Sequence, residues 1–225
     1  MSDAAHAAHD AHHGHPANLA HQFDTLEQQK ESSTFGMWLF LVTEIMFFGG
    51  LFCAYLIYRR ASFAGFAEAS HELDIGLGTF NTAVLIGSSL TMAMAVWAAQ
   101  LGKRKLIVLF LLATILLGGV FLGVKAVEYS HKFHEDHVPG SHFLWEGQFP
   151  DAAEQFYSLY FAMTGLHALH MVIGIGVLFW LCIPAWKGKY GPEYNNPVEV
   201  TGLYWHFVDI VWIFLFPLLY LIGRH

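Results

Sequence analysis

The chain has 225 residues, of which 55% are hydrophobic and 13% are charged, and its formal net charge is −7. A soluble domain carries about 25% charged residues, so this composition excludes an ordinary water-soluble protein. The Lys and Arg residues form no extended basic patch, which argues against a nucleic-acid partner. The apolar residues form long continuous blocks, which predict an all-α integral membrane protein. Cys53 and Cys182 lie inside these blocks, so we expect no disulfide framework.

Residues 1–34 form an Ala- and His-rich segment without an apolar period, and we predict a disordered tail in which residues 24–30 are compatible with a short interfacial helix. The segment lacks the basic start, apolar core and cleavage site of a secretory signal peptide, so the first spanning helix is expected to direct insertion. Its histidines are compatible with a solvated polar tail or with a weak metal site. They are His6, His9, His12, His13, His15 and His21.

Residues 35–225 are predicted to form one membrane domain, because each of five apolar blocks has the roughly 20 residues that cross a bilayer. The expected spans are about 35–58, 79–100, 106–129, 153–183 and 200–223. Residues 59–78 are predicted to be a loop, and Pro184 is predicted to end the fourth span. Five spans place the termini on opposite sides. Lys and Arg in the short loops near residues 104 and 188 favour a cytoplasmic N-terminus and a periplasmic C-terminus.

The first predicted span carries one charged residue, Glu44, and no polar residue of its own helix face can pair with it. A lone charged carboxylate inside an apolar segment costs several kcal/mol, so this position is a functional candidate. One interpretation is a carboxyl group that handles protons or contacts lipid. The alternative is a protonated carboxyl that hydrogen-bonds to a neighbouring helix.

Polar residues also occur within the later spans. Lys125 and Glu128 lie three residues apart and form a candidate ion pair. The fourth and fifth spans each carry a set of polar residues at steps of three and four, which places each set on one helix face. These residues are His167 and His170 in the fourth span, and Glu199, His206 and Asp209, which with Gly202 complete the spacing, around and within the fifth. Metal or haem ligation, proton relay and hydrogen bonding between helices are all compatible with this spacing.

Several runs of residues resemble a known family. They include Trp38-Leu-Phe-Leu-Val-Thr-Glu44, Phe80-Asn-Thr-Ala-Val84, Glu128-Tyr129, Thr164-Gly-Leu-His-Ala-Leu-His170 and Tyr204-Trp-His-Phe-Val-Asp-Ile-Val-Trp212. In this order they resemble subunit III of the haem-copper respiratory oxidases, over about residues 35–223. The chain resembles the five-helix bacterial form, which lacks the first two helices of the seven-helix form. The missing helices form one wall of the family's lipid cleft.

The resemblance implies a non-redox accessory subunit of a proton-pumping terminal oxidase in the bacterial plasma membrane. Such a subunit contains no haem, copper or other metal, because these cofactors reside in partner subunits. It docks directly on subunit I, accompanies subunit II, binds phospholipid and supports proton uptake by the catalytic subunit. The electron donor of the complex is cytochrome c or quinol.

The resemblance also implies roles for the polar residues. Glu44 matches the family's carbodiimide-reactive membrane glutamate, which fits a protonated carboxyl. His167, His170, His206 and Asp209, with Glu199, are then a structural polar lock between the fourth and fifth spans. A function of a different class, a small proton-coupled transporter, would use the same buried groups. Such transporters usually contain internal repeats, and no fixed repeat is evident in the sequence.

Overall fold

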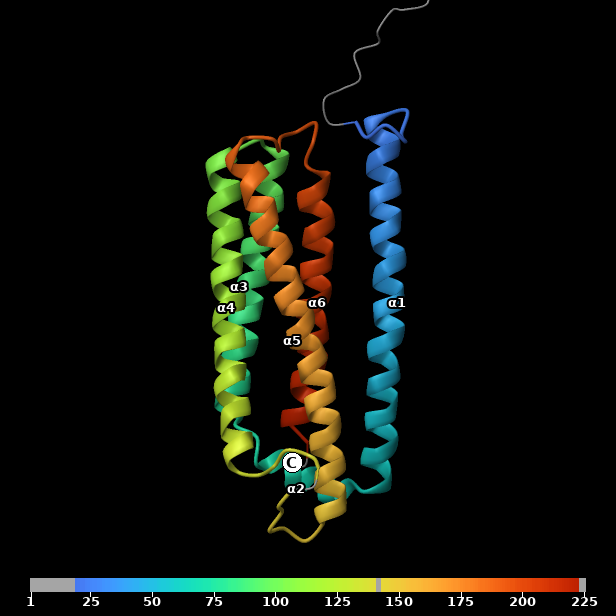
Figure 1. Ribbon diagram of the computed structural model, residues 1–225, viewed down its shortest axis with the longest axis vertical. Helices are drawn as coiled ribbons and strands as arrows, with labels where there is room; N and C mark the ends of the chain where they lie inside the picture. The colour runs from blue at the N-terminus through green and yellow to red at the C-terminus, as the bar shows by residue number, and fades with distance from the viewer. Residues whose placement is uncertain (1–18, 141–142, 223–225) are drawn as a thin grey trace, which may run out of the picture.

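A computed structural model of the protein describes residues 19–140 and 143–222. These residues form six α-helices: α1 (Leu26–Ala61), α2 (Phe63–His71), α3 (Ile75–Gln100), α4 (Arg104–His134), α5 (Pro150–Trp186) and α6 (Asn196–Tyr220). All but α2 are long and apolar enough to cross a membrane, and they run side by side (Figure 1). The predicted all-α bundle of five transmembrane helices is therefore confirmed.

The first helix begins earlier than predicted. Helix α1 starts at Leu26, so residues 26–34 belong to the helix and not to a disordered tail. Thr25 caps it, because its side-chain oxygen accepts a hydrogen bond from the backbone N–H of Gln28 at 3.1 Å. The prediction relied on an apolar period, which a helical turn projecting into water does not show. The tail histidines before residue 19 lie outside the described residues.

Two other predicted boundaries are also wrong. The segment 59–78 was expected to be a loop, yet it contains α2, whose Phe66 is fully buried between the rings of Tyr55 and Phe156. Helix α5 continues past Pro184 to Trp186. A proline in the last turn removes only one backbone hydrogen bond near the end of the helix, so the helix tolerates it there.

The centre of the bundle is built around Trp205 of α6, which is completely buried. Its ring lies against Gly118 of α4 and Gly174 of α5, where an added Cβ would come within 2.9 Å and 3.0 Å of ring atoms. Its indole N–H donates to the hydroxyl of Ser88 on α3 at 2.9 Å. One side chain therefore joins four helices, and the two glycines provide the space for it.

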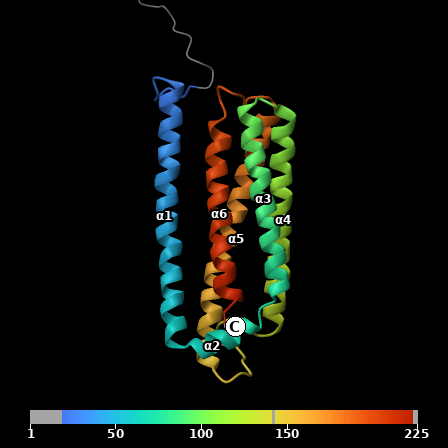
Figure 2. The same cartoon turned by 180° about the vertical axis from the view of Figure 1, so that it is seen from behind.

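Helix α1 stands apart from the other long helices over much of its length (Figures 1 and 2). Its buried residues are Leu41, Phe48 and Tyr55, at steps of seven. This spacing makes one narrow contact stripe along the helix. The helix contacts α5 and α6, and also α2 at its end. The remaining apolar surface of α1 is exposed, as Phe35 and Met46 illustrate.

Candidate functional site

Glu44 has a partner that its own helix could not supply. Its Oε2 lies 3.3 Å from Nε2 of His170 on α5, and both side chains are largely buried. The other ring nitrogen of His170, Nδ1, lies 2.9 Å from the carbonyl oxygen of Leu166. Because a carbonyl only accepts, Nδ1 carries a hydrogen. The contact between Glu44 and His170 is therefore either a neutral acid facing a neutral imidazole or an ionised pair, and the two forms differ by one proton transfer.

The predicted polar lock between the fourth and fifth spans does not form as one network. His206 Nδ1 lies 2.7 Å from the hydroxyl of Ser89 on α3. Glu199 accepts a hydrogen bond from Gln100 of α3 at 2.9 Å and pairs with Lys30 of α1 at 3.1 Å. Helix α6 has neighbours on several sides, so one polar stripe on it meets α3 and α1 and not α5.

A different residue provides the hydrogen bond between α5 and α6. The hydroxyl of Tyr204 donates to the backbone carbonyl of His170 at 3.0 Å. His167 lies on the same face of α5 but points between the rings of Phe121 and Trp212. Neither ring nitrogen of His167 has a hydrogen-bond partner among the described residues. The carboxyl group of Asp209 has only the Ser89 hydroxyl nearby, and neither of its oxygens makes a well-aligned hydrogen bond within the described part of the chain. His167 and Asp209 are 1% and 3% exposed, so both are poorly satisfied polar groups in the interior.

Lys125 and Glu128 lie at the centre of the most complete polar network in the described part of the chain. Lys125 Nζ lies 2.9 Å from Glu128 Oε2 and also donates to the hydroxyls of Tyr160 at 2.9 Å and Tyr220 at 3.0 Å. Both hydroxyls in turn donate to Glu128 Oε1. Every member is thus hydrogen-bonded, and α4, α5 and α6 are joined at this level.

Aromatic rings enclose the ammonium group of Lys125. Nζ lies 5.3 Å from the ring centre of Trp212 and 4.9 Å from that of Tyr160. A cation facing ring faces in a dry site is stabilised by roughly 2 kcal/mol. Sequence reasoning identified the charged pair but missed Tyr220 and Trp212. The sequence signal for these contacts was the presence of tyrosines on α5 and α6 at about the same membrane depth as Lys125 and Glu128.

The described residues contain no group of three or more His, Cys, Asp or Glu side chains that could hold a metal ion. Two cavities lie beside α6 instead. A groove of about 450 Å³ between α1 and α6 is lined almost entirely by apolar side chains such as Phe48 and Phe207. A second cavity of about 410 Å³ between α3 and α6 is lined by Ser89, His206 and Asp209 together with aliphatic residues.

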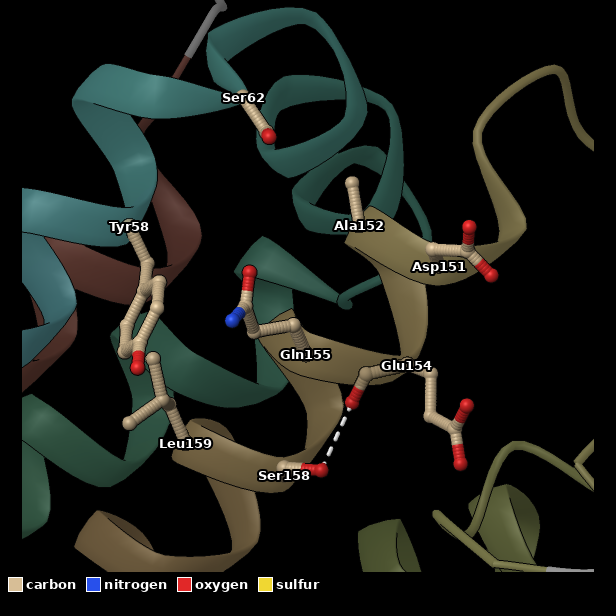
Figure 3. A pocket seen from close by; sticks show the side chains of 8 residues that line it. All are labelled: Tyr58, Ser62, Asp151, Ala152, Glu154, Gln155, Ser158 and Leu159. Carbon is tan, nitrogen blue, oxygen red and sulfur yellow. Dashed lines mark hydrogen bonds between the residues drawn. The ribbon is translucent and has the colours of Figure 1, made fainter.

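A third hollow, of about 550 Å³, lies where the end of α1 meets the start of α5 (Figure 3). Ser62 and Gln155 point into the space between the two helices, and Ser158 donates to the backbone carbonyl of Glu154. Asp151 and Glu154 add two carboxylates, and no Lys or Arg lines the hollow. A phosphate group would therefore meet like charge at this place.

A titratable cluster lies beyond the C-terminal end of α4. Lys132 Nζ lies 2.6 Å from Glu135 Oε2, and His137 Nδ1 lies 3.3 Å from the same oxygen. Partial burial opposes ionisation of Glu135, but the hydrogen bond and charge of Lys132 outweigh it and lower the pKa of Glu135. Burial, followed by the Lys132 charge, lowers the pKa of His137 below its usual 6.5, although Glu135 and Glu72 act in the opposite direction.

We expect the segment around His137 to loosen as the pH falls below 6.5, through the lowered pKa of this residue. The lowered pKa means that the folded state holds fewer protons than the unfolded state, so the stabilising contribution is present above pH 6.5 and declines below it. The ring of Trp145 lies 5.2 Å from that of His137 and reports the change. The measurement is the fluorescence difference between the native protein and Trp145→Phe across this range. His137→Gln should remove the transition, and a difference spectrum independent of pH would contradict the prediction.

Comparison with known proteins identifies the family. The sequence model for cytochrome c oxidase subunit III matches residues 21–224. The chain belongs to the cytochrome c oxidase subunit III family. Relatives of the chain within this family come from both cytochrome c oxidases and quinol oxidases. Quinol oxidase subunit 3 of Bacillus spizizenii is 31% identical over 201 residues, which cover 88% of this chain and 92% of the relative.

Two further relatives are likewise a subunit 3 of a cytochrome c oxidase and a subunit 3 of a quinol oxidase. The probable cytochrome c oxidase subunit 3 of Nocardia farcinica is 33% identical over 187 residues, 83% of this chain and 86% of the relative. Cytochrome bo(3) ubiquinol oxidase subunit 3 of Pseudomonas aeruginosa is 28% identical over 205 residues, 91% of this chain and 92% of the relative. The chain is thus a multi-pass membrane protein and a component of a multi-subunit haem-copper oxidase.

Proposed function

We propose that this chain is the non-redox accessory subunit III of a proton-pumping terminal oxidase, bound directly to the catalytic subunit I and close to subunit II. The match of the family model to nearly the whole chain carries this proposal. The haems and copper would then belong to the partner subunits, and this chain would support their assembly. Cytochrome c and quinol fit equally well as electron donors, because relatives of both kinds match the chain over similar lengths.

A bound phospholipid is part of this proposal, and the groove between α1 and α6 supports it. The groove is lined by apolar side chains from Trp38 to Phe52 on α1 and from Leu203 to Phe214 on α6. An acyl chain in this groove would cover apolar surface that the single contact stripe of α1 leaves open. The interfacial hollow of Figure 3 suits a phosphate headgroup less well, because carboxylates line it.

For orientation, we propose a bacterial plasma membrane with the N-terminus in the cytoplasm and the C-terminus in the periplasm. The end of the bundle that holds the start of α1 also holds the turn from α3 to α4 and the end of α5 (Figure 1). The basic residues of these connections are Lys103, Arg104, Lys105, Lys187 and Lys189. The opposite end carries α2 and residues 135–140 and 143–149, with Glu68, Glu72, Glu135 and Glu146 lining one acidic hollow. Basic residues in short loops favour the cytoplasmic side.

The test is purification of the membrane complex through an affinity tag on this chain. Haem absorption and oxygen consumption should co-purify with it in fixed proportion. A chain that purifies alone, without a haem-containing partner, would refute the proposal. Oxidation of added cytochrome c or of added quinol by the same preparation then decides the electron donor.

Glu44→Gln tests the proposed part in proton uptake. The substitution keeps the size of the side chain but removes the ionisable carboxyl group, whose oxygen lies 3.3 Å from Nε2 of His170. We expect an unchanged haem spectrum, because no cofactor ligand is lost, and fewer turnovers before the oxidase inactivates. The measurement is the total oxygen consumed per haem during continuous turnover. Glu31→Gln, on the same helix but exposed, is the matched control. If the total oxygen consumed per haem is the same in both variants and in the native complex, the result would count against a role of Glu44 in proton uptake.

A further inference from the structure

The cavity between α3 and α6 combines an apolar wall with an unsatisfied polar floor. Its volume is about 410 Å³, and Leu85, Leu90 and Ile213 are among the aliphatic residues that line it. Small-molecule sites in proteins typically have about 300–1,000 Å³ and a few polar groups in an apolar lining. Leu90 and Ile213 are 64% and 47% exposed, so the cavity opens toward the membrane-facing side of the bundle.

The polar floor consists of three side chains from two helices. Ser89 Oγ and His206 Nδ1 are 2.7 Å apart, which leaves Nε2 of His206 without a hydrogen-bond partner among the described residues. Asp209 lines the same cavity and is 3% exposed; the Ser89 hydroxyl lies near its carboxyl group but is already 2.7 Å from His206 Nδ1, so neither carboxyl oxygen has a well-aligned hydrogen-bond partner among the described residues. An unpaired buried polar group costs about 1–3 kcal/mol, so a molecule that pairs with it gains a corresponding advantage.

The depth of this floor restricts what can bind. Asp209 lies about 20 Å along α6 from its start at 1.5 Å per residue, near the middle of the bilayer. With a hydrocarbon core about 30 Å thick, a phospholipid headgroup remains about 15 Å away. An acyl chain reaches this depth but offers no hydrogen bond. A molecule that suits this cavity is soluble in the membrane interior and has an apolar body about the size of a ring. It also carries an oxygen atom that donates or accepts a hydrogen bond.

We propose that this cavity binds an isoprenoid quinone or its hydroquinone through Asp209, Ser89 and His206. A neutral Asp209 carboxyl donates to a quinone carbonyl, and an ionised one accepts from a hydroquinone hydroxyl, so one proton change adapts the floor to either form. The proposal concerns binding alone and involves no electron transfer in this chain. It does not depend on the role in the oxidase, which the haem absorption of the same preparation reports separately.

Photolabelling of the purified complex in quinone-free lipid nanodiscs tests the site. The probe is a short-chain benzoquinone that carries an azide, and mass spectrometry assigns the labelled peptide. We expect the label on residues of α3 or α6 beside the cavity. Excess unlabelled quinone should remove it, and an excess of a long isoprenoid alcohol should not. Loss of the label when only the isoprenoid alcohol is added would overturn the assignment to a quinone.

Two variants and a matched control make the test specific. Leu90→Trp should fill the cavity while leaving its polar floor intact and should reduce labelling at least about tenfold, which corresponds to about 1.4 kcal/mol of binding free energy. Leu116→Trp, at a position of α4 that is 68% exposed, should label like the native complex. Asp209→Leu should also lose the label; if that variant does not assemble, Leu90→Trp decides. Labelling that persists in Leu90→Trp, or none on this chain, would overturn the proposal.

Discussion

Glu128→Gln is expected to destabilise the protein by about 3–5 kcal/mol, the range observed when one member of a buried ion pair is removed. The substitution leaves the ammonium of Lys125 without a counter-charge at a site where the residue is 3% exposed. It also weakens the acceptor for two tyrosine hydroxyls. The measurement is the free energy of unfolding from an SDS titration of the purified protein, followed by helical circular dichroism.

Glu135→Gln is the matched control for this prediction. It is the same substitution at the end of the same helix, and Glu135 also pairs with a lysine three residues away. The side chain of Glu135 is 48% exposed, and Lys132, although only 6% exposed, keeps the backbone carbonyl of Glu72 as an acceptor at 3.0 Å, so we expect a smaller loss of stability than for Glu128→Gln. The double variant Lys125→Met/Glu128→Met should lose less unfolding free energy than Glu128→Gln alone, because it leaves no uncompensated charge. Equal losses in the two glutamine variants would show that the buried pair is not the origin of the stability.

Trp205→Ala should cost about 3–5 kcal/mol, the usual loss when a large buried aromatic side chain is truncated. Within a membrane the helices associate mainly through close packing, since lipid tails are as apolar as the side chains. Truncation opens a space between the two glycine-lined helix surfaces that Trp205 fills, and it leaves the Ser88 hydroxyl without its donor. The assay is the same SDS titration, together with the yield of assembled complex.

Trp180→Ala provides the comparison, because Trp180 is 65% exposed on α5. A surface substitution of this kind changes stability by about 0.5 kcal/mol or less. Trp205→Phe should fall between the two, since it keeps most of the ring volume but loses the N–H donor. A Trp205→Ala protein as stable as Trp180→Ala would mean that the neighbouring helices close over the space.

The membrane bundle could be predicted from the sequence because each span must satisfy its backbone hydrogen bonds internally, which makes long apolar runs diagnostic of helices. The same reasoning failed at the ends of the helices. The first turns of α1, which include Lys30, are rich in polar residues and carry no apolar signal, and α2 is short and packs against α5. Burial there depends on contacts between distant segments, as the position of Phe66 between Tyr55 and Phe156 illustrates.

The candidate sites were only partly predictable. Spacing identified that His206 and Asp209 share a helix face, but it could not say which neighbouring helix that face meets. The structure places Ser89 of α3 against His206, where a lock with α5 was expected. Likewise, nothing local to α1 indicated His170 as the partner of Glu44, because the two are brought together only by the packing of α1 on α5.

The narrow contact stripe of α1 has a consequence for the order in which the protein is built. Among the described helices, α1 leaves the ribosome before the two long helices that it contacts, α5 and α6, with α3 and α4 made in between. Since each transmembrane helix is stable by itself in the bilayer before helices associate, α1 must persist as a separate helix until α5 and α6 have been made. During that interval its partner-facing stripe, with Glu44, is open to lipid. A chaperone or an early-bound lipid that shields this stripe would therefore act on the growing chain and not on the finished subunit.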